Sequence, residues 1–381
     1  MNLWEHPSII AMEALRHLED ALVIVPMCAT DKTSEFTTTA NGWKVGDTVS
    51  FRTHGEYAVD EFAGTINVQP ISTSTRSMSI EKHFDVSVEV TAREEALDLD
   101  SFSEQVIRPA VYKMAETIDR YVGTKILEAA GMYTSPNLFT SAADIAQARK
   151  AATIQQLEMN RFCLVDLDTE ATLLGQEWFN QAQTRGGAGV DTLQSGIMGR
   201  VMGMNFASSI GFPVSNHAPG SITGVTADNS GDANQIGSRT LQVAVGTGAI
   251  EVGDRLTVAG VRRPLKVATA VGDISGVTTF DLVDPITEVI ANGAAVTVIG
   301  AGVADIETHA AIFDDRSLAV GFPMLEIPGD RVAGVASNNG INVRIVKGYE
   351  LTNKITTMSI DMLAGSFALD PRRITLCGSI I

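Results

Sequence analysis

Residues 107–126 read IRPAVYKMAETIDRYVGTKI and carry a long helical pattern. The apolar side chains that recur along it every three or four residues are Ile107, Val111, Met114, Ile118, Val122 and Ile126. This spacing places them on one face of a helix of about five turns. The preceding Ser101-Phe102-Ser103-Glu104 matches a capping box. Pro109 predicts a kink or a second start, because a proline cannot continue the hydrogen-bond ladder.

Strand patterns precede this helix, from Gly42 to Glu94. Phe84, Val86, Val88 and Val90 alternate with polar residues, which predicts a half-buried strand. Residues 54–80 are polar and rich in Ser and Thr, and loops of this length are usually functional or disordered. We therefore expect a long excursion from the body of the protein between two strands.

The first segment of the chain predicts a short amphipathic helix that ends before Pro26. The apolar residues at helical spacing are Ile9, Met12, Leu15, Leu18 and Leu22. A single amphipathic helix near a terminus must bury this stripe, either against its own subunit or against a neighbour.

The sequence after the long helix mixes helices and strands. Ser141 is a candidate cap for a second helix, and residues 162–165 (FCLV) predict a short buried strand. Residues 221–303 then differ from both flanks, because they contain no Met, Cys, Trp, Tyr or His. Short alternating segments separated by turn signals such as Gly253-Asp254 predict a small all-β barrel or sandwich, inserted into a host domain that resumes at about residue 304.

Composition and motifs argue against several classes of function. The net charge of −17 and the scattered Lys and Arg residues do not fit a surface that grips nucleic acid or acidic lipid. Cys28, Cys163 and Cys377 are far apart and predict buried, reduced thiols. No secretory signal and no apolar run long enough to span a membrane are present. No phosphate loop, nucleophile elbow or metal-ligand spacing occurs, so we expect no catalytic, cofactor or metal site.

The order of these segments resembles the major capsid proteins of tailed bacteriophages with the Hong Kong type of fold (HK97-like), in the branch with an inserted β-barrel, as in the Lederbergvirus coat. The stretches similar to that branch are residues 13–25, Glu35-Phe36 and residues 45–49, Ile107-Arg108-Pro109-Ala110 with Ile118-Asp119-Arg120, residues 251–261, and the ending from residues 309–313 to 361–365. The resemblance covers nearly the whole chain, and the order of elements carries it.

The resemblance implies an α+β fold with an N-terminal arm, an extended β loop, a long spine helix and an axial domain that carries the inserted barrel. The implied segments are an arm (1–41), extended loop strands (42–94), a spine helix with peripheral domain (95–136), a first axial part (137–220), the insertion (221–303) and a second axial and peripheral part (304–381). The residues expected to make assembly contacts are Leu15, Leu18, Leu22, Arg52 and Arg76.

The implied function is self-assembly, in the host cytoplasm, into the icosahedral shell of a virion that encloses double-stranded DNA. The implied partners are other copies in hexamers and pentamers, a separate scaffolding protein, a portal protein and, in particles that carry one, a decoration protein. No lysine occurs in residues 45–81, so the lysine-to-asparagine crosslink of some relatives cannot be carried over. Two alternatives remain open: another virion protein such as a tail tube or adhesin, and a hydrolase with an appended β domain.

Overall fold

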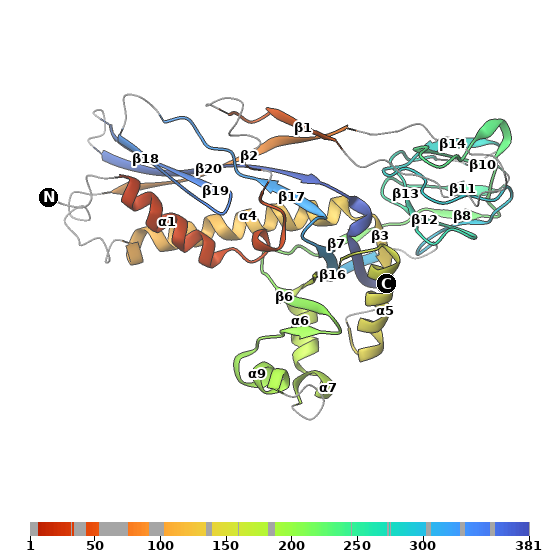
Figure 1. Cartoon of the computed structure of the whole chain (residues 1–381), viewed down its shortest axis with the longest axis horizontal. Coiled ribbons are helices and arrows are strands. Elements are labelled where there is room, and N and C mark those ends of the chain that lie inside the picture. The colour runs from red at the N-terminus through yellow and green to blue at the C-terminus, as the bar shows by residue number, and fades with distance from the viewer. Residues whose placement is uncertain are drawn as a thin grey trace, which may run out of the picture.

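The computed structural model is an α+β protein that combines two larger sheets, several helices and a β-rich unit (Figure 1). It describes residues 7–31, 33, 43–52, 75–90, 103–134, 139–158, 160–181, 187–244, 246–272, 274, 276–301, 306–327, 332–350 and 355–380. Most of the predicted excursion, residues 53–74, lies outside the described residues, as do the first two residues of the predicted capping box.

The long helix α4 spans Arg108–Ala129 and follows a π-helical turn, η3, at Ser103–Ile107. Pro109 lies in the first turn of α4, where its missing N–H costs no hydrogen bond, so it marks a second start. All six apolar residues that predicted this helix are buried. The prediction of one buried face is confirmed.

The first sheet is antiparallel and lies over the helices α1 and α4 (Figure 1). Its strand order is β1 (Thr48–Arg52), β2 (Thr75–Val90), β20 (Ile355–Ala368), β19 (Ile341–Glu350) and β18 (Val332–Asn338), and β17 (Leu318–Gly321) also pairs with β20. The predicted alternation at residues 84–90 falls in the second half of β2, where it pairs with β20. The sheet thus joins strands that lie more than 200 residues apart in the sequence.

Helix α1 (Pro7–Ala21) forms where the sequence predicted it and packs against β18, β19 and α4. Its buried face differs by part of a turn from the predicted one and consists of Ile10, Ala11, Ala14, Leu15 and Leu18. Met12 is 65% exposed. The prediction that Met12 lies in the stripe was therefore wrong, since small residues allow the helix to approach the sheet along a different line. Pro26 lies in a 3₁₀ turn, η2 (Val25–Met27).

The second sheet is mixed and carries most of the remaining helices. Its strand order is β3 (Met132–Thr134), β21 (Thr375–Ile380), β16 (Ile306–Asp314), β4 (Arg161–Val165), β6 (Met204–Ser208) and β5 (Arg200–Val201), with β7 (Ser215–His217) also paired to β16. The shorter helices are α5 (Ala142–Ile154), α6 (Leu167–Leu174), α7 (Glu177–Asn180), α9 (Gly187–Ser195) and the 3₁₀ turn η5 (Pro371–Arg373). Ser141 caps α5 in a capping box with Asp144, which confirms that prediction.

Residues 221–301 form a β-rich unit at one end of the molecule (Figure 1). Its elements are β8 (Ser221–Thr223), β9 (Thr226–Ala227), the turn η4 (Ser230–Asp232), β10 (Thr240–Ala244), β11 (Thr247–Ala249), β12 (Arg255–Val258), β13 (Leu265–Lys266), β14 (Thr278–Asp281) and β15 (Val296–Val298). In the described part of the unit they make three small sheets, none of which closes into a barrel, so the barrel prediction was wrong. Strands of two to five residues, separated by turns at Gly253 and Gly260 with positive φ, are too short to form a continuous ladder.

The β-rich unit has a hydrophobic core of its own, and its two connections to the rest of the chain lie side by side. The buried side chains of this core all come from residues 225–298. The strand before the unit, β7, is antiparallel to the strand after it, β16, with His217 opposite Ile306. The chain therefore leaves the second sheet and returns to it at the same place, as expected of an insertion.

We expect residues 221–303 expressed alone to give dispersed amide NMR signals and one cooperative thermal transition. The core of buried Val, Leu, Ile and Phe280 is internal to the unit, and the segment exceeds the roughly 40 residues below which disulfides or metals are usually needed. A random-coil spectrum would contradict the boundaries. A control segment of similar length, residues 304–381, should not fold alone, because its strands need partners from elsewhere in the chain.

Candidate functional site

No catalytic arrangement appears in the part of the chain that the structure describes. Among these residues, no group of three or more His, Cys, Asp or Glu side chains is placed to hold a metal ion. Cys28, Cys163 and Cys377 are free and buried, and burial raises the pKa of each thiol. In the same residues, no helix has the length and apolar character needed to cross a bilayer.

The three predicted arm leucines lie inside this chain. Leu15, Leu18 and Leu22 are at most 5% exposed and belong to the core shared by α1, α4 and the first sheet. Within this chain α1 packs against β18, β19 and α4, and the expectation that these leucines also make assembly contacts stays a prediction. The sequence pattern gives a buried face and does not say which chain buries it.

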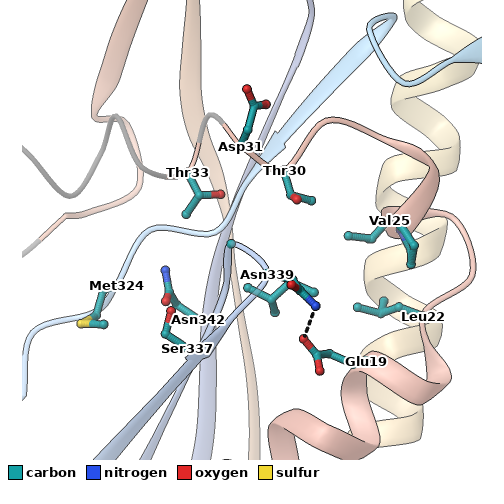
Figure 2. Close-up of a pocket in the computed structure, with 13 residues that line it drawn as sticks. Glu19, Leu22, Val25, Thr30, Asp31, Thr33, Met324, Ser337, Asn339 and Asn342 are labelled. Carbon is teal, nitrogen blue, oxygen red and sulfur yellow. Dashed lines mark hydrogen bonds between the residues drawn. The ribbon is translucent and has the colours of Figure 1, made fainter.

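A groove of about 800 Å³ lies between the end of α1 and the β18–β19 hairpin (Figure 2). Leu22 and Val25 line one side of it, and Asn342 lines the other. Asn338 and Asn339 each donate an amide hydrogen bond to Glu19, at 3.0 and 3.3 Å, and so tie the hairpin to α1.

The arm is fastened to the spine helix α4 by one buried carboxylate. Asp119 is 3% exposed and accepts hydrogen bonds from the backbone N–H of Val23 (3.0 Å) and Ile24 (3.2 Å) and from the hydroxyl of Ser209 (3.4 Å). Burial raises the pKa of Asp119, and the backbone N–H groups oppose that rise. Sequence reasoning missed this role. The available sequence signal was the position of Asp119, which lies four residues from both Ala115 and Gly123. The carboxylate is therefore on the side of the helix with the smallest side chains.

The remaining two predicted contact residues lie on the paired strands β1 and β2. Arg52 is the last residue of β1, and its backbone lies opposite Thr75. Arg76 is on β2, where its guanidinium forms an ion pair with Asp284 of the β-rich unit at 2.9 Å. It also donates to the backbone carbonyl of Ala368 at 3.5 Å. Arg76 thus makes a contact within the chain, between the extended strand and the inserted unit.

Two buried cations join the β-rich unit to the carbonyl end of α4. Lys266 donates to the backbone carbonyl of Glu128, and Arg255 donates to that of Ala130 at 3.4 Å. The last carbonyls of a helix lack partners within the helix and carry partial negative charge, so cations are favoured there. Burial lowers the pKa of Lys266 to about 8 and that of Arg255 to about 10. The available sequence signal for this contact was that Lys266 is the only lysine of residues 221–303.

We expect the stability difference between the natural chain and Lys266→Met to change with pH between about 8 and 10.5, the folded and ordinary pKa values of this lysine. In that range the unfolded chain holds the proton and the folded chain releases it, so the lysine raises stability as pH increases. The change is on the order of 3 kcal/mol. Urea unfolding of both proteins between pH 7 and 10.5 measures it. If the stability difference between the two proteins stays constant with pH, Lys266 is solvated like a surface lysine.

A further contact between segments lies where the chain passes into the β-rich unit. Asp254 is 1% exposed and accepts hydrogen bonds from the backbone N–H of Glu251 (2.8 Å) and Gly220 (3.1 Å), and its other oxygen lies 2.9 Å from His217 Nε2. The predicted Gly253-Asp254 turn therefore holds the segment after β7 in place.

Large apolar side chains are exposed near the β5–β6 hairpin. Ile197 is 63% exposed and Ile210 is 65% exposed, and Met202 and Val214 are partly exposed in the same stretch. Strand β6 lies on the lower lobe with α6 and α9 (Figure 1), whereas Ile210 and Val214 adjoin Gly211, which packs against Asp119 of α4.

Comparisons with known proteins gave likenesses among solved structures. No protein-family model and no curated protein matches the chain. A structure described as Mycobacterium phage Che8 is 9% identical, with a TM-score of 0.49, over 93% of this chain and 90% of that chain. The capsid structure of the Cyanophage P-SCSP1u is 13% identical, with a TM-score of 0.45, over 89% and 85%. A virus-like particle from Pyrococcus furiosus is 8% identical, with a TM-score of 0.40, over 96% of each chain.

Proposed function

We propose that this chain is a major capsid subunit of a tailed bacteriophage, and that many copies assemble into an icosahedral shell around double-stranded DNA. The role is structural, with binding energy supplied by complementary surfaces buried between identical subunits. The chain acts in the virion, after assembly in the host cytoplasm.

The observation that carries this proposal is the order and placement of the elements. An arm helix, a strand of 16 residues, a spine helix of 22 residues and an interrupted second sheet follow one another in the order expected from the resemblance to HK97-like capsid proteins. The strand and the helix both run along an elongated body, with the β-rich unit at one end and a lobe of short helices at one side (Figure 1). An elongated body with several projecting parts offers a long perimeter for contacts with neighbours.

The partners of such a subunit are other copies in hexamers and pentamers, a separate scaffolding protein, a portal protein and, in particles that carry one, a decoration protein. The acidic charge suits a container, because a shell that does not attract the packaged polymer leaves it free to exit. We further propose that the β-rich unit corresponds to the insertion of the Lederbergvirus-like branch.

Electron microscopy of the purified chain, alone and with a co-expressed scaffolding protein, tests this function. We expect closed particles or isolated hexamers and pentamers. Open tubes would favour a tail-tube protein. A monodisperse monomer under every condition would contradict assembly and return the hydrolase alternative to consideration. Denatured particles should run as single chains on a gel, because no lysine lies in residues 45–81 for the known type of crosslink.

A further inference from the structure

A polar cavity of about 370 Å³ lies between the β-rich unit and the second sheet. Its charged lining residues are Arg262, Arg263, Glu288, Asp370, Arg372 and Arg373. Arginines exceed carboxylates by two in this lining, whereas the whole chain carries 45 acidic and 28 basic residues. The lining therefore carries a positive balance, although Arg372 and Arg373 are each already paired with a carboxylate.

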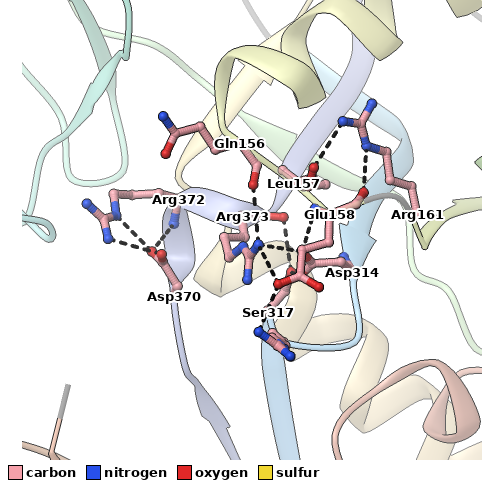
Figure 3. A network of polar contacts seen from close by, with 10 residues as sticks. Gln156, Leu157, Glu158, Arg161, Asp314, Ser317, Asp370, Arg372 and Arg373 are labelled. Atoms are coloured by element: carbon pink, nitrogen blue, oxygen red, sulfur yellow. Dashed lines mark hydrogen bonds and ion pairs between the residues drawn. The ribbon is translucent and has the colours of Figure 1, made fainter. Parts of the chain in front are cut away.

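One wall of the cavity is preformed by the turn η5. Arg372 holds Asp370 with two bonds, from Nε to Oδ1 at 2.8 Å and from Nη2 to Oδ2 at 3.0 Å (Figure 3). Arg373 lies 3.1 Å from the fully buried Asp314 and donates to the backbone carbonyl of Gln156 at 3.2 Å. These contacts fix both guanidinium groups, so no large rearrangement is needed to receive a ligand.

The opposite wall contains Arg262, whose positive charge is not paired with a carboxylate of the described residues. The backbone N–H of Arg262 donates to Glu288 Oε2 at 3.0 Å, which fixes its main chain. Its side chain is exposed, and within the described residues its guanidinium has no hydrogen bond or ion pair. An exposed guanidinium over a basic recess is a site for an oxyanion, because a carboxylate can accept two parallel N–H bonds from it.

We propose that this cavity binds the carboxylates of an acidic segment from a second copy of this chain, an inference that rests on the proposed assembly function. Every copy carries a surplus of carboxylates, so contact between two copies brings acidic segments toward a basic recess. A recess of this size admits side chains and excludes a nucleic-acid duplex.

The test uses the purified, unassembled full chain and a fluorescent hexaglutamate peptide, with binding followed by fluorescence anisotropy. We expect saturable binding that weakens as salt is added. Arg262→Glu should weaken it at least tenfold, and Arg262→Glu with Arg263→Glu should abolish it. Arg239→Glu is the matched control, since Arg239 is an exposed arginine of the same unit outside the cavity. It should leave binding within twofold of the natural chain.

Three results would overturn the inference. They are no binding by the natural chain, equal loss in the Arg239 control, and displacement of the peptide by a short DNA duplex at lower concentration than by unlabelled peptide. The measurement needs no particles, so a chain that binds the peptide but never assembles refutes the assembly function alone. If the natural chain binds no peptide and Arg262→Glu still forms normal particles, the cavity inference alone is refuted.

Discussion

Replacing Asp119 by alanine is expected to lower the free energy of unfolding by about 3–5 kcal/mol. The carboxylate is the buried acceptor for the backbone N–H groups of Val23 and Ile24 and for the hydroxyl of Ser209. Without it these donors stay buried and unsatisfied, and each unsatisfied buried donor costs about 1–3 kcal/mol. The arm would detach from α4 at the turn that follows α1.

Equilibrium urea denaturation measures this loss. Asp119→Asn keeps one acceptor oxygen and should lose less, while Asp20→Ala removes an exposed carboxylate of α1 and should change stability by no more than about 0.5 kcal/mol. If Asp119→Ala were as stable as Asp20→Ala, the arm would not be held by this carboxylate.

Leu18→Ala is expected to destabilise the folded chain by about 2–5 kcal/mol, the usual cost of emptying a leucine site in a core. Leu18 is 1% exposed between α1, the first sheet and α4. Met12 lies on the same helix but is 65% exposed. Met12→Ala should therefore leave stability within about 0.5 kcal/mol of the natural chain.

Comparing Leu18→Ala with Met12→Ala distinguishes packing of α1 within its own subunit from packing across a neighbour. If α1 packs within its own subunit, Leu18→Ala lowers the unfolding midpoint of the unassembled chain. If the helix instead lay across a neighbour, the unassembled chain would keep its stability and only assembly would suffer. Thermal unfolding of the dispersed subunit at low concentration, followed by circular dichroism, decides between these outcomes.

Local patterns predicted the secondary structure well where one face of an element is buried. The six apolar residues from Ile107 to Ile126, the cap at Ser141 and the alternation from Phe84 to Val88 all lie as expected. In each case the signal is the periodicity of the element itself, which does not depend on its partner.

Tertiary detail did not follow from these patterns. The identity of the surface that buries α1 depends on strands near residues 332–350, far along the chain, so Leu15 and Leu18 could not be assigned to a partner. Barrel closure depends on ladder length, which the strands of the β-rich unit do not reach. Asp119, Arg255 and Lys266 each act on backbone groups of another segment. The identity of a side chain says nothing about which distant carbonyl or N–H it will meet.

The pairing of β7 with β16 bears on the order of folding, because closing the loop between them costs chain entropy. His217 meets Ile306 across about 88 intervening residues, and the entropy lost on closing a flexible loop grows as the logarithm of its length. If residues 221–303 collapse first into their own core, the two strands are joined by a compact body in place of a long flexible loop. For an effective loop of roughly ten residues, the closure cost falls by about 2 kcal/mol. The order of folding, from the β-rich unit to the second sheet, would then be set by topology.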